Sequence, residues 1–159
     1  MTHETTAFDR HDHAHCVRSA LGATEAASAD RGLKLTPVRR RVLEILLEAH
    51  EALGAYDVLD RLAAEGLGSK PPVAYRALSF LVENGFAHRI ERLNAFVACG
   101  HPGEQHDPAF MICRSCKTVA EAPMRSAALG QTAEASGFAI EQTVIEAEGL
   151  CAACQETAT

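Results

Sequence analysis

Residues 70–99, KPPVAYRALSFLVENGFAHRIERLNAFVAC, contain the pattern that decides the fold of the first two thirds of this 159-residue chain. An amphipathic helix is predicted over residues 73–84, because apolar side chains recur there every three or four positions. Gly85 follows at a position where helices commonly end. The predicted inward face consists of Ala74, Ala77, Leu78 and Leu81. Tyr75 and Arg76 therefore project to the outside.

A β-hairpin is predicted directly after this helix. Residues 86–92 and 95–99 are apolar-rich strand candidates. Leu93 and Asn94 separate them, and asparagine tolerates the positive φ that a tight hairpin turn needs.

Three more helices are predicted upstream. The first covers residues 16–29, the second begins at Pro37 with Thr36 as its N-cap, and the third covers residues 55–65. Helices followed by a hairpin are typical of a winged helix-turn-helix domain, whose last helix enters the major groove of DNA. Trihelical bundles also serve as protein-binding modules, so the pattern alone leaves both uses open.

The distribution of charge favours DNA for this part of the chain. The net charge is -6, but residues 31–92 carry ten basic against eight acidic residues, including the run Arg39, Arg40, Arg41. A local anion-binding face is one interpretation, and a solvated helix face is the other. Arg76 is the best candidate for reading a base, since a guanidinium can bridge O6 and N7 of guanine.

The last third of the chain predicts a small α/β lobe that holds a metal. Strands are expected over residues 109–113 and 118–121, a helix over 125–136 and a β-rich run over 138–148. The lobe contains two Cys-x2-Cys hooks, which are Cys113 with Cys116 and Cys151 with Cys154. Four thiolates in two short hooks suit a tetrahedral zinc ion that is closed to other ligands.

The composition excludes several classes of protein. The chain has no signal-peptide pattern and no apolar run long enough to cross a bilayer, so we expect a cytoplasmic protein without a membrane partner. Clustered cysteines in a reducing compartment are better explained as metal ligands than as disulfides. Neither an enzyme active site nor a small-molecule substrate is expected, because no catalytic group has an orienting partner.

Motifs along both lobes resemble the ferric uptake regulator family, and within it the zinc uptake regulators. They run in order from about residue 30 to residue 155. They are Leu35-Thr36-Pro37-x-Arg39, Ala55-Tyr56-Asp57, Lys70-Pro71-Pro72, Tyr75-Arg76-Ala77-Leu78, Gly85-Phe86-x-His88, the two hooks, and the segment from Val144 to Cys151.

The resemblance implies a zinc-dependent repressor that binds palindromic double-stranded DNA operators as a homodimer and represses zinc-uptake genes. It implies an α+β chain: a polar tail (1–15), a winged-helix domain (16–99), a hinge loop (100–107) and a dimerisation and zinc-binding domain (108–159). The residues expected at the DNA are Arg76, Tyr75, Tyr56, Lys70 and Arg39.

The resemblance also implies two Zn²⁺ per subunit. It assigns the four hook cysteines to a structural ion. A regulatory ion would lie at the hinge, on His88, Cys99, His106 and Glu121. Two imidazoles, one thiolate and one carboxylate suit tetrahedral zinc, and the thiolate disfavours iron.

Several alternatives stay open at this stage. His101 could replace His106 as a ligand, and the N-terminal residues His11, His13, His15 and Cys16 could form an additional metal site. Within the family, the protein could sense iron, nickel, manganese or peroxide. From another class, it could store zinc or bind a protein partner through its trihelical lobe.

Two residues depart from the family pattern. Val73 stands where a threonine is usual, which removes a hydroxyl that could cap the helix or contact a phosphate. Lys117 stands where a glycine usually follows the first hook, which predicts a different turn there.

Overall fold

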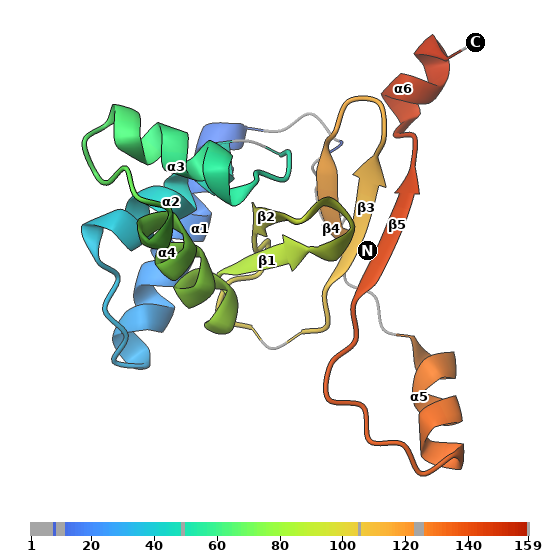
Figure 1. Cartoon of the computed structure of the whole chain (residues 1–159). Coiled ribbons are helices and arrows are strands. Elements are labelled where there is room, and N and C mark those ends of the chain that lie inside the picture. Colours follow the sequence, from blue (N-terminus) through green and yellow to red (C-terminus); the bar gives the residue numbers. More distant parts are fainter. Residues whose placement is uncertain (1–7, 9–11, 49, 105, 123–125, 159) are drawn as a thin grey trace.

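The computed structural model describes residues 8, 12–48, 50–104, 106–122 and 126–158. Helices form one side of the molecule and a three-stranded sheet forms the other, with a short hairpin between them (Figure 1). The expected α+β class, helical first and with a mixed sheet after it, is confirmed.

The N-terminal part is a helical bundle. Its helices are α1 (His13–Asp30), α2 (Pro37–Glu48), α3 (Ala55–Ala64) and α4 (Pro71–Glu83). Thr36 Oγ1 accepts a hydrogen bond from Arg39 N, so the predicted N-cap of α2 forms. The predicted inward face of α4 is buried at Ala74, Ala77, Leu78 and Leu81, and packs with α2 and α3 into one core.

A hairpin follows α4, as the sequence predicts. Gly85 has φ +77, which ends the helix in the left-handed conformation that glycine adopts at low cost. Strands β1 (Ala87–Ile90) and β2 (Ala95–Ala98) then pair antiparallel. Together with the helices they make a winged helix-turn-helix arrangement, in which the hairpin is the wing.

The first wing strand is shorter than expected. Instead of continuing to residue 92, the chain turns into a short 3-10 helix, η1 (Glu91–Leu93), and Asn94 follows with φ 46. The physical reason lies outside the hairpin. The backbone N–H groups of Glu91 and Arg92 donate to the carboxylate of Glu146, and so are not used to extend the β1–β2 ladder.

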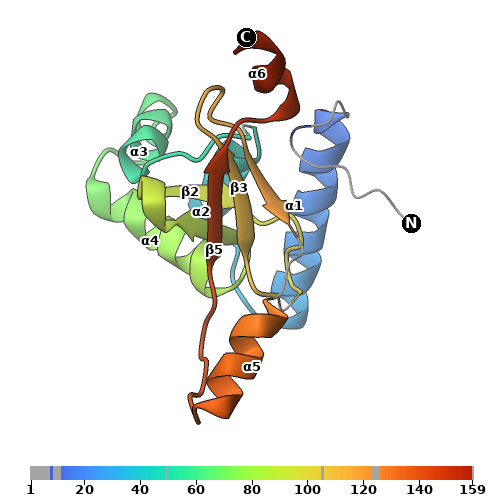
Figure 2. The same cartoon turned by 90° about the vertical axis from the view of Figure 1, so that its right-hand side faces the viewer.

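The C-terminal part is a mixed sheet in the order β4–β3–β5. Its strands are β3 (Ala109–Cys113), β4 (Val119–Ala122) and β5 (Ile145–Gly149); β3 runs antiparallel to β4 and parallel to β5. Helix α5 (Ala127–Ala135) projects away from the rest of the chain, and α6 (Ala152–Thr157) ends it (Figure 2).

Two details of this lobe differ from the prediction. The β-rich run expected over residues 138–148 is a strand only from Ile145, because β3 begins at Ala109 and Ala109 pairs with Ile145. Residues before Ile145 therefore have no residue of β3 to pair with. Helix α6 was not expected.

The wing packs against the C-terminal sheet. Ile90 and Val97 of the wing are buried with Phe110, Ile112 and Val119 of the sheet, in a second hydrophobic core between the lobes. The segment after α2 also connects the two parts, since Glu51 bridges to Thr118 and Leu53 to Phe96. No helix among the described residues is long and apolar enough to cross a membrane.

Candidate metal centres and nucleic-acid interface

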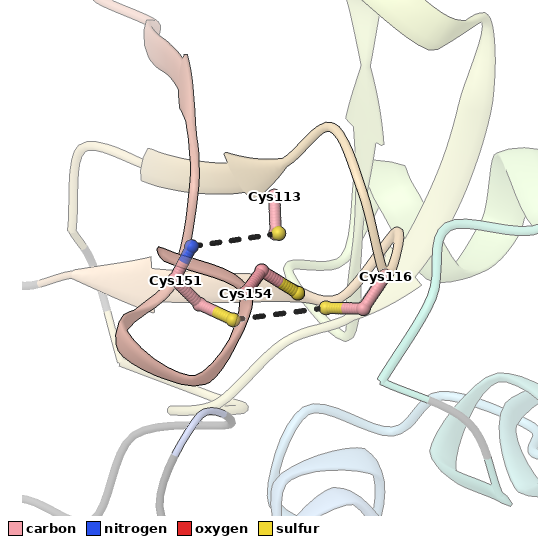
Figure 3. A group of neighbouring side chains, drawn as sticks. All are labelled: Cys113, Cys116, Cys151 and Cys154. Atoms are coloured by element: carbon pink, nitrogen blue, oxygen red, sulfur yellow. Dashed lines mark hydrogen bonds between the residues drawn. The ribbon is translucent and has the colours of Figure 1, made fainter. Parts of the chain in front are cut away.

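The two cysteine hooks meet at the end of the sheet. Cys113 ends β3, Cys116 lies in the following turn, and Cys151 and Cys154 lie at the start of α6 (Figure 3). All four Sγ atoms lie within 4.8 Å of one another, and those of Cys116 and Cys151 are 3.9 Å apart. A tetrahedron with Zn–S bonds of about 2.3 Å has edges of roughly 3.8 Å, so the sulfurs fit a four-thiolate metal centre.

The surroundings of the first hook favour thiolates. The backbone N–H of Cys151 lies 3.5 Å from Cys113 Sγ, and donation from this group and from Cys116 N lowers the pKa of Cys113 to about 6. The Thr118 hydroxyl, 3.2 Å from Cys116 Sγ, lowers the pKa of Cys116. Ser115 lowers the pKa of Cys154, but Cys151 and burial outweigh it and raise that pKa to about 11. Adjacent thiolates without a cation repel one another, which explains the last shift.

The turn after the first hook keeps a glycine-like shape despite Lys117. Lys117 has φ 66, in the left-handed region, and its Nζ donates to Arg114 O at 2.8 Å. Lys117 thus adopts the backbone conformation that glycine would adopt, and no different turn is needed to bring the sulfurs together. The backbone instead carries the strain of a left-handed lysine.

A second group of metal-binding side chains joins the two lobes. It consists of His88 on β1, Cys99 just after β2, His106 in the connecting loop and Glu121 on β4. One ligand atom from each lies within 4.8 Å of the others. Residues 33 positions apart in sequence thus meet at the boundary between the wing and the sheet.

Hydrogen bonds orient these donors. Gly100 N donates to Glu121 Oε2 at 2.8 Å, so Oε1 is the oxygen that faces His88 and His106. His106 Nδ1 lies 2.9 Å from Glu104 O, which accepts the Nδ1 proton and leaves Nε2 for a metal. Nothing in the sequence signals these backbone groups, because every residue carries them.

The pKa shifts at this site show which donors carry a charge and which carry a proton that a metal ion would displace. Burial, with the nearby carboxylate of Glu121, raises the pKa of Cys99 to about 12. Burial alone would raise the pKa of Glu121, but His88, Gly100 N–H and His106 outweigh it and lower that pKa to about 2. Burial alone would lower the pKa of His106, but Glu104 O and Glu121 raise it. The site therefore combines one fixed negative charge with donors that a metal ion can deprotonate.

One buried atom indicates that the residues fit a metal. His88 Nε2 is buried and has no hydrogen-bond partner among the described residues. It lies 3.4 Å from Glu121 Oε1, and its ring lies against Phe110 at 5.4 Å between centroids. Buried polar atoms normally have a partner, and coordination to a cation would give this nitrogen one.

The alternative ligands do not join either group. His101 touches the site through its backbone, since His101 N donates to Cys99 Sγ at 3.3 Å, and His106 occupies the ligand position. His13 lies in the first turn of α1, where Nε2 is 3.2 Å from Glu48 O, and His15 and Cys16 are exposed on the same helix. His11 lies outside the described residues.

The side chains expected at DNA lie on exposed parts of α3 and α4. Tyr75 and Arg76 are exposed near the start of α4, Lys70 precedes that helix, and Tyr56 is exposed in the first turn of α3. Within the described residues, neither Lys70 nor Arg76 takes part in an ion pair. Val73 is only partly buried and packs against the core, so it is less accessible than Tyr75 and Arg76.

The guanidinium groups of Arg39, Arg40 and Arg41 on α2 largely contact other groups of the protein itself. Arg41 donates to Glu44, Glu48 and Glu65, and Arg40 pairs with Glu25 and Glu44. The guanidinium of Arg39 lies 3.8 Å above the ring of Phe80 and donates to Lys34 O. Most of this positive charge therefore ties helices together.

Comparison with known proteins identifies the family. Residues 30–147 match the ferric uptake regulator family. The chain belongs to this family. It is a transcription regulator and not an enzyme. The zinc uptake regulation protein of Escherichia coli (strain K12) is 41% identical over 144 residues, covering 88% of this chain and 84% of that protein.

Solved structures of related regulators share the fold. A zinc uptake regulator complexed with zinc and DNA has a TM-score of 0.82 at 40% identity, covering 89% of this chain and 97% of that one. Holo XcZur has a TM-score of 0.79 at 41% identity (87% and 98% covered), whereas apo XcZur, at 42% identity (89% and 99% covered), has 0.52. The structure of this chain is therefore more similar overall to holo XcZur than to apo XcZur.

Proposed function

We propose that this protein is a zinc-responsive transcriptional regulator that binds DNA. In full, it is a homodimeric repressor with two Zn²⁺ per subunit, which binds palindromic operators when its regulatory site is filled and represses zinc-uptake genes. The observation that carries the proposal is the convergence of His88, Cys99, His106 and Glu121 from both lobes on one point.

The two metal centres have different roles, one structural and one regulatory, because their positions in the fold differ. The four hook cysteines all belong to the C-terminal lobe, where a closed site stabilises the fold. His88 and Cys99 belong to the winged-helix part, and Glu121 belongs to the sheet. Bound zinc would supply coordinate bonds that hold these residues together, so the angle between the lobes depends on occupancy.

The free energy of zinc binding is large enough to switch the protein between two lobe arrangements. Shifting an equilibrium between two lobe arrangements from about 1:99 to 99:1 needs about 5.5 kcal/mol of differential affinity. Without a metal, His88 Nε2 lacks a hydrogen-bond partner among the described residues, and the Cys99 thiol is protonated. Bound zinc would give both groups a partner and so stabilise the lobe arrangement in which these residues meet. The higher TM-scores with the zinc- and DNA-complexed regulator and with holo XcZur support this interpretation.

DNA recognition rests on the exposed start of α4. Tyr75 and Arg76 project there, and Lys70 lies beside them. In a winged helix this part of the last helix lies in the major groove, where arginine reads guanine and lysine contacts phosphate. Tyr56, exposed on α3, would contact the backbone of the DNA, and Arg39 on α2 would have to leave the Phe80 ring and Lys34 O to do the same.

The homodimer is supported by the exposed apolar side chains of the C-terminal lobe. Leu129 on α5 and Phe138, Ile140 and Val144 in the following segment are 38–67% exposed. Only Ala133 of α5 is buried, so this helix has little packing within its own chain. A second copy of the chain would cover these residues and place two α4 helices on the two halves of a palindrome.

Fluorescence anisotropy with DNA from upstream of the protein's own gene tests the proposal. We expect tight binding with zinc, loss of binding when a chelator empties the regulatory site, and loss in Cys99→Ser. Cys16→Ser is the matched control, because Cys16 is exposed on α1 and outside both metal groups. Binding that ignores the chelator and Cys99→Ser would show that the protein is not a zinc sensor.

Metal analysis separates zinc from the other metals of the family. The purified protein is stripped at the regulatory site and offered zinc, iron, nickel and manganese in competition. We expect zinc to be retained, because the site contains a thiolate. Retention of iron in preference to zinc would contradict the assignment.

A further inference from the structure

One row of side chains crosses the C-terminal sheet and faces the wing. Phe110 on β3 pairs with Glu121 on β4 and with Glu146 on β5. Directly paired residues point to the same face of a sheet. Phe110 is buried in the core between the lobes, so both carboxylates flank that core on the side of the wing.

The two carboxylates of this row contact the wing at different places. Glu121 approaches His88 on β1 and belongs to the regulatory site. Glu146 contacts the short 3-10 helix η1 that directly follows this strand, where its Oε1 accepts from Glu91 N at 2.7 Å and its Oε2 from Arg92 N at 3.0 Å. One carboxylate thus satisfies two consecutive backbone N–H groups of the other lobe.

A second contact lies beside the first. Glu148 is two residues after Glu146 on β5 and so points to the same face. Its Oε2 and Oε1 accept from Arg92 Nε at 3.0 Å and Nη2 at 3.3 Å. This paired geometry is the strong form of an arginine–carboxylate contact, although Arg92 is more than half exposed and salt will weaken it.

We infer that Glu146, with the Arg92–Glu148 pair, is a clamp that holds the wing on the sheet and positions His88 for the regulatory metal. The clamp contains no metal ligand, and it fixes η1, which directly follows the strand that bears His88. It therefore lowers the free-energy cost of assembling the regulatory site. The inference deepens the proposed function and depends on it only for the identity of the metal.

Coupling between the clamp and the metal must be reciprocal. If the clamp favours the lobe arrangement that binds metal, then metal binding strengthens the clamp by the same factor. The affinity of the regulatory site for zinc and the protection of the Glu91 and Arg92 amides should therefore change together. These two quantities can be measured without DNA.

Zinc titration against a chromogenic chelator tests the clamp in the full-length protein loaded at the hooks. Glu146→Ala should weaken zinc binding at the regulatory site by about fivefold or more, a typical coupling between sites. Hydrogen exchange of the Glu91 and Arg92 amides should become faster. Glu146→Gln, which keeps the shape but loses the charge, should give a smaller effect in the same direction. Glu134→Ala removes an exposed carboxylate from α5 and is the matched control.

A charge exchange tests the second contact. Arg92→Glu and Glu148→Arg should each weaken zinc binding, and the double variant should recover most of the loss. Wild-type zinc affinity in Glu146→Ala, or a loss no larger than that of Glu134→Ala, would overturn the clamp. Zinc-independent DNA binding by the wild type would instead overturn the proposed function, so the two failures are distinct.

Discussion

His88 Nε2 and Glu121 Oε1 lie 3.4 Å apart across the boundary between the wing and the C-terminal sheet. The two residues come from different lobes, and both side chains are largely buried, at 13% and 9% exposure. A cation held between them would connect the lobe that carries the DNA-binding helix to the lobe that carries the hooks. The four-cysteine centre has no such position, since all its ligands lie in the C-terminal lobe.

The four-cysteine zinc site should be essential for the stability of the C-terminal lobe. Cys113→Ser removes a ligand whose Sγ is buried at the end of β3. We expect loss of one zinc per subunit and a fall in the free energy of unfolding of about 3 kcal/mol or more, because metal binding at such sites contributes to folding. Metal analysis and urea denaturation measure both. Cys16→Ser should behave as wild type, and equal zinc content in both variants would refute the assignment.

Replacing Lys117 by glycine should stabilise the protein. A left-handed φ costs a side-chain-bearing residue about 1 kcal/mol that glycine does not pay, so Lys117→Gly should raise the free energy of unfolding by about that amount. Lys117→Ala keeps the strain and loses the bond from Nζ to Arg114 O, so it should not stabilise. Equal stability of the two variants in thermal melts would mean that the backbone strain does not matter.

The start of α4 should determine operator affinity. Arg76→Ala should weaken specific binding by about 1–3 kcal/mol and relax the preference at one base position, whereas Lys70→Ala should weaken all sequences alike. Ser79→Ala, exposed further along α4, is the control. Anisotropy with operator and scrambled DNA distinguishes these effects. Normal operator binding by Arg76→Ala would remove Arg76 from the interface.

The ion pairs between α2 and α3 should make stability depend on pH. Hydrogen bonding to Arg41 lowers the pKa of Glu65 below its ordinary value. A lowered pKa stabilises the folded state above the unfolded pKa of about 4.3, and this contribution disappears as the pH falls through the folded pKa. Glu65→Gln should therefore be less stable than wild type at pH 7, by a modest amount because the pair is exposed.

Urea denaturation at a series of pH values measures this difference. It should be constant above about pH 5 and shrink in more acid solution. Glu83→Gln, exposed at the end of α4, should show no such change. A difference between wild type and Glu65→Gln that does not vary with pH would show that the pairing with Arg41 is unimportant.

Local patterns in the sequence were sufficient for most of the elements. The apolar spacing of α4 predicted its buried face, and Gly85 and Asn94 marked turns where the structure has positive φ. Strand β3 was predicted at its observed bounds. These successes share a cause, because hydrophobic periodicity and positive φ are properties of a few neighbouring residues.

Local patterns failed where a distant group decides the structure. The first wing strand was predicted to reach residue 92, but Glu146, more than fifty positions later, binds the amides that would extend it. The charge pattern left the arginine run open between an anion-binding face and a solvated helix face, and the structure pairs most of it with Glu44, Glu48 and Glu65. In both cases the partner is a glutamate that looks like any solvated side chain in the sequence.

The sequence by itself determined that four thiolates come as two hooks, since each pair needs only a tight turn to place both sulfurs on one side of an ion. Only the tertiary structure decided that His88 and Glu121 meet, and that Glu146 lies across Phe110 from Glu121. The register of β4, β3 and β5 and the packing of the wing on that sheet create these contacts. Such long-range pairing leaves no periodic mark in the residues that make it.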